Sequence, residues 1–324
     1  MSVTQSIKRP LVVLTGPTAA GKTKLSIALA KAIGGEILSA DSMQVYKHMD
    51  IGSAKIRPEE MQGVPHHLID ILEPWEEFNV VVFQKRCLEC MEQIYDRGHI
   101  PILVGGTGFY IQAVLRGIDF TENEENTEYR EKLEQLAEEK GPEVLHEMLA
   151  KVDPVSAENI HANNIKRTIR ALEYYELTGE PISAHNEREK ERTSPYNFSY
   201  FVLTDDREKL YERIESRIDE MLSEGLVEEV RSLEKMGCHR GMVSMQGLGY
   251  KEILEYLDGE CSLEEAVYTL KRDTRHFAKR QLTWFRREKE VTWLDKQQFD
   301  YDEEKILEYM LKELGEKGIY EKQQ

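Results

Sequence analysis

The 324-residue sequence has few cysteines and no long apolar run, and each absence excludes a class of protein. No apolar run approaches the ~18 residues that a membrane-spanning helix needs. The four cysteines, Cys87, Cys90, Cys238 and Cys261, contain one C-x-x-C pair. Because no second pair and no spaced histidine pair follows, buried free thiols are favoured over a metal site. The polar start Met1–Pro10 leads directly into a strand, so we expect no cleavable signal peptide and a cytoplasmic protein without a membrane anchor.

An excess of positive charge is also missing, since 43 Lys and Arg stand against 60 Asp and Glu, for a net charge of −17. A chain this acidic is not a general nucleic-acid binder, although a local basic groove is compatible with it. The stretch Lys271 to Glu290 holds eight bases and three acids, interleaved with aromatic rings. This mixture suits a nucleic-acid strand. The alternative is that its Lys and Arg side chains only neutralise acidic side chains of the protein itself.

A phosphate-loop motif follows the first strand pattern, Leu11–Thr15, and opens a helix predicted for Lys22–Ile33. Its glycines let backbone N–H groups face an anion at the positive end of that helix. Lys22 adds a charge aimed at the terminal phosphate, and the Thr23 hydroxyl suits a Mg²⁺ shell. The motif predicts a site for a metal-bound di- or triphosphate; a chance glycine turn is the alternative. It consists of Gly16, Pro17, Thr18, Ala19, Ala20, Gly21, Lys22 and Thr23.

Two further strands end in residues that suit a ligand site. The second, Glu36–Asp41, ends in a carboxylate, and the third, Ile100–Val104, runs into a glycine turn. Ligands of open α/β sheets lie beyond the carboxyl ends of the strands, so we expect Asp41 beside the phosphate loop. There it could serve as a Mg²⁺ ligand or a general base. A turn or helix-cap aspartate is the alternative.

The composition changes at Asp119, after which thirteen acids and four bases occur up to Ile160. The residues from there to Asn197 show helical patterns and a charged linker, Asn186–Tyr196, before a strand resumes at Phe198–Leu203. We therefore predict an α/β fold like that of P-loop NTPases, a parallel sheet flanked by helices with an inserted all-helical subdomain. Its parts are the first core segment 1–118, the insertion 119–197, and the second core segment 198–324 with basic C-terminal helices.

Other elements are predicted from apolar periodicity and caps. Arg213 and Arg217 are four apart in one of these helices, so one or both could reach a phosphate. The predicted helices are Val80–Arg97, Tyr129–Lys140, Val144–Val152, Asn163–Glu173, Arg207–Leu222, Val227–Met236, Gly249–Leu257, Ser262–Glu288 and Glu303–Leu314, with short strands at His67–Leu72 and Val291–Leu294.

Several stretches together resemble the bacterial tRNA dimethylallyltransferases, and they follow one another along nearly the whole chain. The phosphate loop is common to many enzymes, whereas D-S-x-Q and A-K-R-Q-x-T-W are narrow motifs. Asn164 and Phe277 depart from the aspartate and tyrosine expected in that family. The matching stretches are Gly16–Thr23, Ser39–Tyr46, Leu103–Tyr110, Gln246–Glu252 and Thr274–Arg286.

The resemblance implies transfer of a dimethylallyl group from dimethylallyl diphosphate to N6 of adenosine 37 in tRNA. It implies that Asp41 is the base, and that Lys22, Thr23, Mg²⁺ and Arg217 stabilise the departing diphosphate. The main alternative is a small-molecule kinase or another P-loop NTPase, in which Asp41 would activate a hydroxyl acceptor.

The resemblance also implies contacts with the anticodon stem-loop of tRNA by a monomeric protein. The residues around the extruded adenine would be Asp41, Ser42, Met43, Gln44 and Thr107. Those along the path of the RNA would be Lys166, Arg167, Arg170, Gln246, Gly249, Lys251, Lys279, Arg280, Gln281, Trp284 and Arg286.

Overall fold

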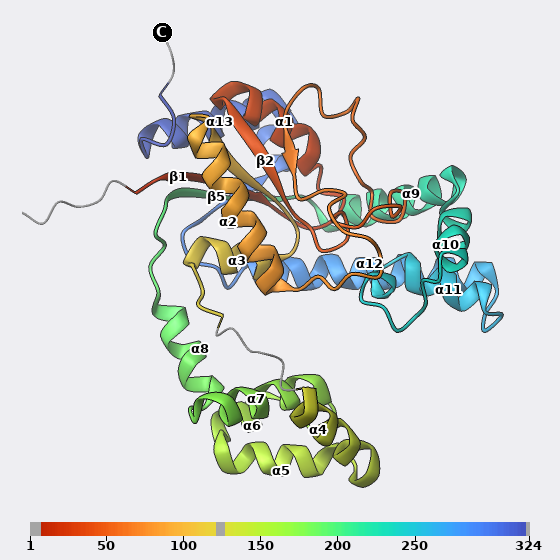
Figure 1. The fold of residues 1–324 in the computed structure, drawn as a ribbon. Coiled ribbons are helices and arrows are strands. Elements are labelled where there is room, and N and C mark those ends of the chain that lie inside the picture. Colours follow the sequence, from red (N-terminus) through yellow and green to blue (C-terminus); the bar gives the residue numbers. More distant parts are fainter. Residues whose placement is uncertain (1–7, 121–126, 322–324) are drawn as a thin grey trace, which may run out of the picture. The chain divides into compact units, whose positions relative to one another are not determined.

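The computed structural model describes residues 8–120 and 127–321, in which six strands form one parallel sheet (Figure 1). Residues 1–7 of the polar start and residues 121–126 of the acidic stretch lie outside the described residues. The strand order is β3-β2-β4-β1-β5-β6, and every neighbouring pair is parallel. The strands are β1 (Pro10–Thr15), β2 (Gly35–Ala40), β3 (His66–His67), β4 (Ile100–Gly105), β5 (Asn197–Thr204) and β6 (Val291–Asp295).

The register of the sheet brings the carboxyl ends of its strands to one edge. Thr15 of β1 and Ala40 of β2 both lie opposite Gly105 of β4. On the other side, Thr204 of β5 lies opposite Asp295 of β6. The segments that follow β1, β2, β4, β5 and β6 therefore all begin at the same edge of the sheet, where ligands of such folds bind.

Helices cover both faces of the sheet, which explains why β1 is apolar along its length. Leu11 and Val13 point into one core cluster, and Val12 and Leu14 into the other. The second cluster packs against α1 (Lys22–Ile33) and α13 (Glu303–Glu316). The first packs against α2 (Val80–Asp96), α3 (Gly108–Arg116), α9 (Arg207–Glu224), α10 (Leu226–Lys235), α11 (Tyr250–Leu257) and α12 (Leu263–Phe285). The predicted α/β fold is confirmed.

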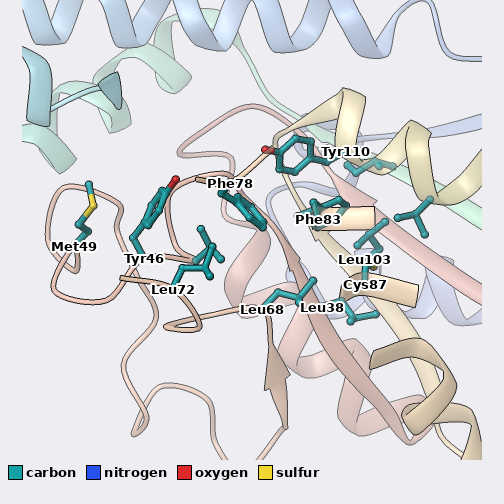
Figure 2. Packing of buried hydrophobic residues seen from close by; sticks show 14 of the residues in the cluster. Leu38, Tyr46, Met49, Leu68, Leu72, Phe78, Phe83, Cys87, Leu103 and Tyr110 are labelled. Carbon is teal, nitrogen blue, oxygen red and sulfur yellow. The ribbon is translucent and has the colours of Figure 1, made fainter. Parts of the chain in front are cut away.

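An aromatic cluster supports the segment that follows β2 (Figure 2). The Phe83 and Tyr110 rings stack with centroids 4.5 Å apart. Phe78 contacts Tyr46 and Tyr110 edge to face, at 6.4 and 5.8 Å between centroids. Burial raises the pKa of Tyr46 to about 12. This packing holds Tyr46, at the end of the turn that begins at Asp41, because buried aromatic pairs contribute more stability than the burial of their surface area alone.

Residues 116–194 form a second compact unit. Its own core contains Leu133, Leu145, Leu149 and Ile169. The predicted insertion, 119–197, begins and ends a few residues later than this unit. The helices are α4 (Thr127–Lys140), α5 (Pro142–Val152), α6 (Pro154–Asn159), α7 (Ile165–Thr178) and α8 (Ile182–Glu191).

Two local predictions are wrong. The charged linker Asn186–Tyr196 is helical up to Glu191, because α8 is fixed at its start: Ser183 donates to Asp153 from its N–H at 2.9 Å and its hydroxyl at 2.6 Å. The strand predicted for 67–72 stops after its first residue, because Leu68 and Asp70 have positive φ angles of 64° and 54°. No helix of the described residues is long and apolar enough to cross a membrane.

Candidate active site at the carboxyl edge of the sheet

The phosphate loop joins β1 to α1 in a conformation that only glycine permits at two places. Gly16 passes so close to the Leu203 carbonyl oxygen that a Cβ atom would collide with it. Gly21 lies in the left-handed region, with φ of 91°, and caps α1 without any side-chain hydrogen bond. The first N–H groups of a helix have no intrahelical partner. Without a capping side chain, they remain available for an anion.

Two cations lie together at this loop. The Lys22 ammonium donates hydrogen bonds to the carbonyl oxygens of Gly16 at 3.0 Å and Pro17 at 2.8 Å. Burial and the nearby Arg217 guanidinium lower the pKa of Lys22 to about 8, against the opposing effect of Asp41. Burial also lowers the pKa of Arg217; Glu220 opposes this effect and Arg213 adds to it. Neither Lys22 nor Arg217 forms an ion pair within residues 8–120 and 127–321, so the site favours an anionic ligand.

Asp41 follows β2 directly and lies close enough to Lys22 to favour the charged ammonium. Its Oδ1 atom accepts hydrogen bonds from the N–H groups of Met43 at 2.8 Å and Gln44 at 3.3 Å. Its Oδ2 atom has no hydrogen-bond partner among the residues that the structure describes. The turn thus orients the carboxylate through Oδ1 and leaves Oδ2 available to a ligand.

The residues predicted to surround an adenine lie next to Asp41. The Gln44 side chain accepts from the Ser39 hydroxyl at 3.1 Å and donates to backbone carbonyls of residues 53 and 54. The Thr107 N–H donates to the Ala40 carbonyl at 3.3 Å, which ties the glycine turn after β4 to the end of β2. The Met43 side chain packs against Gly247, and Ser42 is half-buried.

Gln281 of α12 connects the two glycine-rich turns. Its side-chain oxygen accepts from the Thr18 N–H at 2.9 Å, and its amide nitrogen donates to the Gly106 carbonyl at 3.0 Å. The residue is 6% exposed. Both polar atoms of this side chain therefore hold the turns, and the tRNA contact predicted for Gln281 stays a prediction. Trp284 packs similarly against Gly108.

The basic side chains on one face of α12 fall into two groups, those that pair with an acidic side chain and those that have no acidic partner among the described residues. Arg275 forms an ion pair with Glu215 at 2.6 Å, and Lys271 pairs with Asp219 at 2.6 Å. Arg280 stacks over Phe277 instead, with its guanidinium carbon 5.7 Å from the ring centroid. Lys279, Arg280 and Arg286 are exposed and have no acidic partner in the part of the chain that is described. A cavity of about 490 Å³ lies on this face, lined by His276, Lys279, Arg280, Thr283, Trp284 and Arg287.

The other residues predicted to bind tRNA are distributed over both units. Lys166 and Arg167 are exposed on the first turn of α7 in the second unit, and Arg170 is half-buried there. Gln246, at the end of a 3₁₀ turn (Ser244–Gln246), and Lys251, on α11, are exposed. The Gln246 side chain donates to the Arg240 carbonyl.

Gly249 is placed differently, because its N–H donates to the Glu252 carboxylate at 2.8 Å and starts α11. The described structure thus assigns this glycine a role at the start of the helix.

Comparisons with known proteins decide the family. A family model described as IPP transferase matches residues 44–288, and one described as isopentenyl transferase matches residues 10–71. A tRNA dimethylallyltransferase of Lachnoclostridium phytofermentans is 64% identical over 96% of this chain and 99% of its own length. One of Carboxydothermus hydrogenoformans is 53% identical over 94% and 97%. The chain belongs to the tRNA dimethylallyltransferase family.

Solved structures agree with this membership. The tRNA isopentenylpyrophosphate transferase of Bacillus halodurans is 47% identical, with a TM-score of 0.72 over 96% of this chain and 98% of that one. A eukaryotic dimethylallyltransferase acting on tRNA is 31% identical, with a TM-score of 0.77 over 89% of this chain and 74% of that one.

Two members of this site were missed or left open by sequence reasoning. Arg213 holds the phosphate loop, since its Nε donates to the Ala19 carbonyl at 2.9 Å and its Nη1 pairs with Asp205 at 2.7 Å. Lys296 lies beside Gly21. The available signal was its position directly after the last strand, at the same edge as the loop.

The chemistry of the donor set fits a magnesium ion that is shared with a ligand. Thr23 is exposed at the start of α1, and its hydroxyl has no partner in the described structure. No group of three acidic, histidine or cysteine residues able to hold a metal occurs in residues 8–120 and 127–321. Magnesium commonly binds through few protein oxygens, with waters and substrate phosphates completing its shell.

Proposed function

We propose that this protein transfers the dimethylallyl group of dimethylallyl diphosphate to N6 of adenosine 37 in tRNA, releasing diphosphate. The observation that carries the proposal is a pair of cations, Lys22 and Arg217, that form no ion pair with the described residues and lie next to a carboxylate whose second oxygen has no partner among them. The relatives named tRNA dimethylallyltransferase support it.

The diphosphate group binds the N–H groups at the start of α1, with Lys22 and Arg217 around it. As the bond between the allylic carbon and the diphosphate oxygen breaks, negative charge grows on that oxygen. Preorganised donors that face developing charge lower the barrier more than they strengthen ground-state binding. Thr23 would hold Mg²⁺, which when bound neutralises charge on the leaving group. No phosphoryl group moves in this reaction, although the loop is of the kinase type.

Asp41 supplies the base. The N6 amine of adenine is a weak nucleophile because its lone pair is delocalised into the ring. As N6 forms its bond to the allylic carbon, Oδ2 of Asp41 accepts one amine proton, and the electron pair of the broken C–O bond leaves with diphosphate. The hydrogen bonds to Oδ1 keep Oδ2 oriented. The adenine reaches this position only when extruded from its stack, with Ser42, Met43, Gln44 and Thr107 around it.

The protein binds the anticodon stem-loop as a monomer in this proposal. The unpaired side chains of Lys279, Arg280 and Arg286 contact phosphates, and the Trp284 ring lies beside Lys279 and Arg280 in the same cavity. In the second unit, Lys166, Arg167 and Arg170 add contacts along the stem. Because these Lys and Arg side chains concentrate positive charge on local faces, a chain of net charge −17 can still bind RNA in this proposal.

The test is to incubate the full chain with Mg²⁺, dimethylallyl diphosphate and an anticodon stem-loop RNA, then digest the RNA and weigh its nucleosides. The expected product is adenosine that carries one dimethylallyl group, with one diphosphate released for each. A parallel RNA with guanosine at position 37 should gain no mass. Phosphoryl transfer from a nucleoside triphosphate to a small acceptor, without an alkylated adenosine, would instead indicate a kinase.

A further inference from the structure

Lys296 lies at the edge of the phosphate loop although the sequence separates it from the motif by more than 270 residues. It is the first residue of the 3₁₀ turn Lys296–Phe299 and directly follows β6. A Cβ atom built on Gly21 would lie 2.7 Å from the Lys296 ammonium nitrogen. The ammonium is therefore next to the start of α1, where the unpaired N–H groups are, and the absent side chain at Gly21 leaves room for it.

The charges around Lys296 leave its ammonium without an ion-pair partner in residues 8–120 and 127–321. Arg213 and Lys24 are the neighbouring cations, and Glu303 and Asp205 are the neighbouring acids. Each acid already has a cation of its own, since Glu303 pairs with Lys24 at 2.8 Å and Asp205 with Arg213 at 2.7 Å. Burial lowers the pKa of Lys296, and Arg213 lowers it further.

A partly desolvated cation without a counter-ion is costly, and folded proteins normally pair such charges. Two features make a bound anion the natural partner here: the position beside the free helix start, and the two acids that are occupied elsewhere. We propose that Lys296 is a further diphosphate-binding residue of this site, which binds phosphate oxygens from the Gly21 side of the loop. The inference rests on the proposed function, because it takes the ligand of the loop to be a diphosphate.

The test uses inorganic diphosphate with Mg²⁺ as the probe and calorimetry on the full chain at low ionic strength. Lys296→Ala should weaken binding about fivefold, as expected for one partly exposed charge contact. Lys296→Arg keeps the charge and should stay within about twofold of the natural protein. The matched control is Lys31→Ala, which removes an exposed lysine from the last turn of α1, where its ammonium donates to the Gln62 side chain at 2.8 Å. It should not change the affinity.

The outcomes separate this inference from the proposed function. If the natural protein binds diphosphate, Lys22→Ala weakens it, and Lys296→Ala does not, the inference about Lys296 fails alone. An equal loss in Lys31→Ala would also overturn it, because the effect would then follow net charge and not position. A natural protein that does not bind diphosphate overturns the proposed function, and the inference with it. Should Lys296→Ala fail to fold, Lys296→Gln takes its place in the same titration.

Discussion

Two charged clusters lie at opposite ends of the same sheet, and they differ in how their charges are matched. At the amino end, Glu36 of β2 is 2% exposed and accepts from Arg97 at 2.8 and 2.7 Å. Ring nitrogens of His99 and His67 lie 2.6 Å from its two oxygens. At the carboxyl end, Lys22 and Arg217 lie buried or half-buried without such a partner in the described chain.

The difference separates a structural cluster from a ligand site. The Arg97 hydrogen bonds lower the pKa of Glu36 to about 2, against the opposing effect of burial, with His99 and His67 adding to the decrease. That cluster needs no ligand, because both carboxylate oxygens of its buried acid have hydrogen-bond partners within the protein. At the carboxyl end, burial lowers the pKa of Lys22 and of Arg217. A bound anionic ligand would provide the counter-ion that these two cations lack among the described residues. The two clusters should therefore respond oppositely to mutation, one in stability and one in catalysis.

The largest effect is expected from Asp41→Asn, which keeps the shape of the side chain and the turn but removes the proton acceptor. Turnover of the stem-loop RNA should fall by roughly 10²–10⁴, while the Kd for RNA changes little. Single-turnover rates and RNA binding titrations measure the two. Near-normal turnover would reject Asp41 as the base, and partial rescue by raised Mg²⁺ would point to a metal ligand.

Lys22→Ala should lower kcat by roughly 10²–10³ and also weaken diphosphate binding, because charge on the leaving group grows in the transition state. In the natural protein, diphosphate binds the charged ammonium, whose pKa is lowered to about 8. Affinity for diphosphate should therefore decline as pH rises above about 8, as calorimetry over a pH series would show. An effect of Lys22→Ala confined to KM would mean that the lysine only docks the substrate.

Glu36→Gln should act on stability alone, with a loss of about 2 kcal/mol in the free energy of unfolding, as is typical when hydrogen bonds to a buried charged group are lost. The pKa of Glu36 is depressed in the folded state, so its contribution is present above the unfolded pKa near 4.5 and is lost as pH falls toward about 2. Urea unfolding between pH 7 and 3 should show a smaller decline for Glu36→Gln than for the natural protein. A change in diphosphate affinity in this variant would contradict the separation of the two clusters.

The smallest effect is expected on α12, where a paired and an unpaired arginine can be compared. Arg280→Ala should weaken RNA binding and flatten the slope of log Kobs against log[salt] by about 0.7 for a loop phosphate or about 0.9 for a duplex phosphate. Arg275→Ala removes the partner of Glu215 and should leave that slope unchanged. Equal slopes for the natural protein and Arg280→Ala, with a lowered Tm, would make Arg280 a structural residue.

The parts of the site that depend on local sequence patterns could be predicted. The parts that depend on which distant segments lie side by side in the sheet could not. The helix Lys22–Ile33 has the predicted bounds, and the second strand ends at Ala40, one residue before its predicted end at Asp41, because glycine turns and strand ends are local signals. The cluster around Glu36 joins residues from three separate segments, and nothing in the spacing of Glu36, His67, Arg97 and His99 identifies it.

Long side chains add a second limit to prediction from sequence. Gln281 belongs to a stretch that reads as an RNA-binding helix, yet it turns inward to the backbone of two loops. Lys296 reaches Gly21 only because β6 is placed next to β5 in the sheet. Both contacts require the strand order, which the sequence pattern does not contain.

The central claim is that the cations at the carboxyl edge are matched by the diphosphate of a prenyl donor. The most direct measurement is the free energy of unfolding of the full chain with Mg²⁺, with and without dimethylallyl diphosphate and in the absence of any nucleoside triphosphate. At a concentration of 100 times its Kd, dimethylallyl diphosphate should stabilise the natural protein by about 2.7 kcal/mol. At the same concentration it should stabilise Lys22→Ala far less. No stabilisation by dimethylallyl diphosphate, with strong stabilisation by ATP, would contradict the account and assign the loop to a nucleotide.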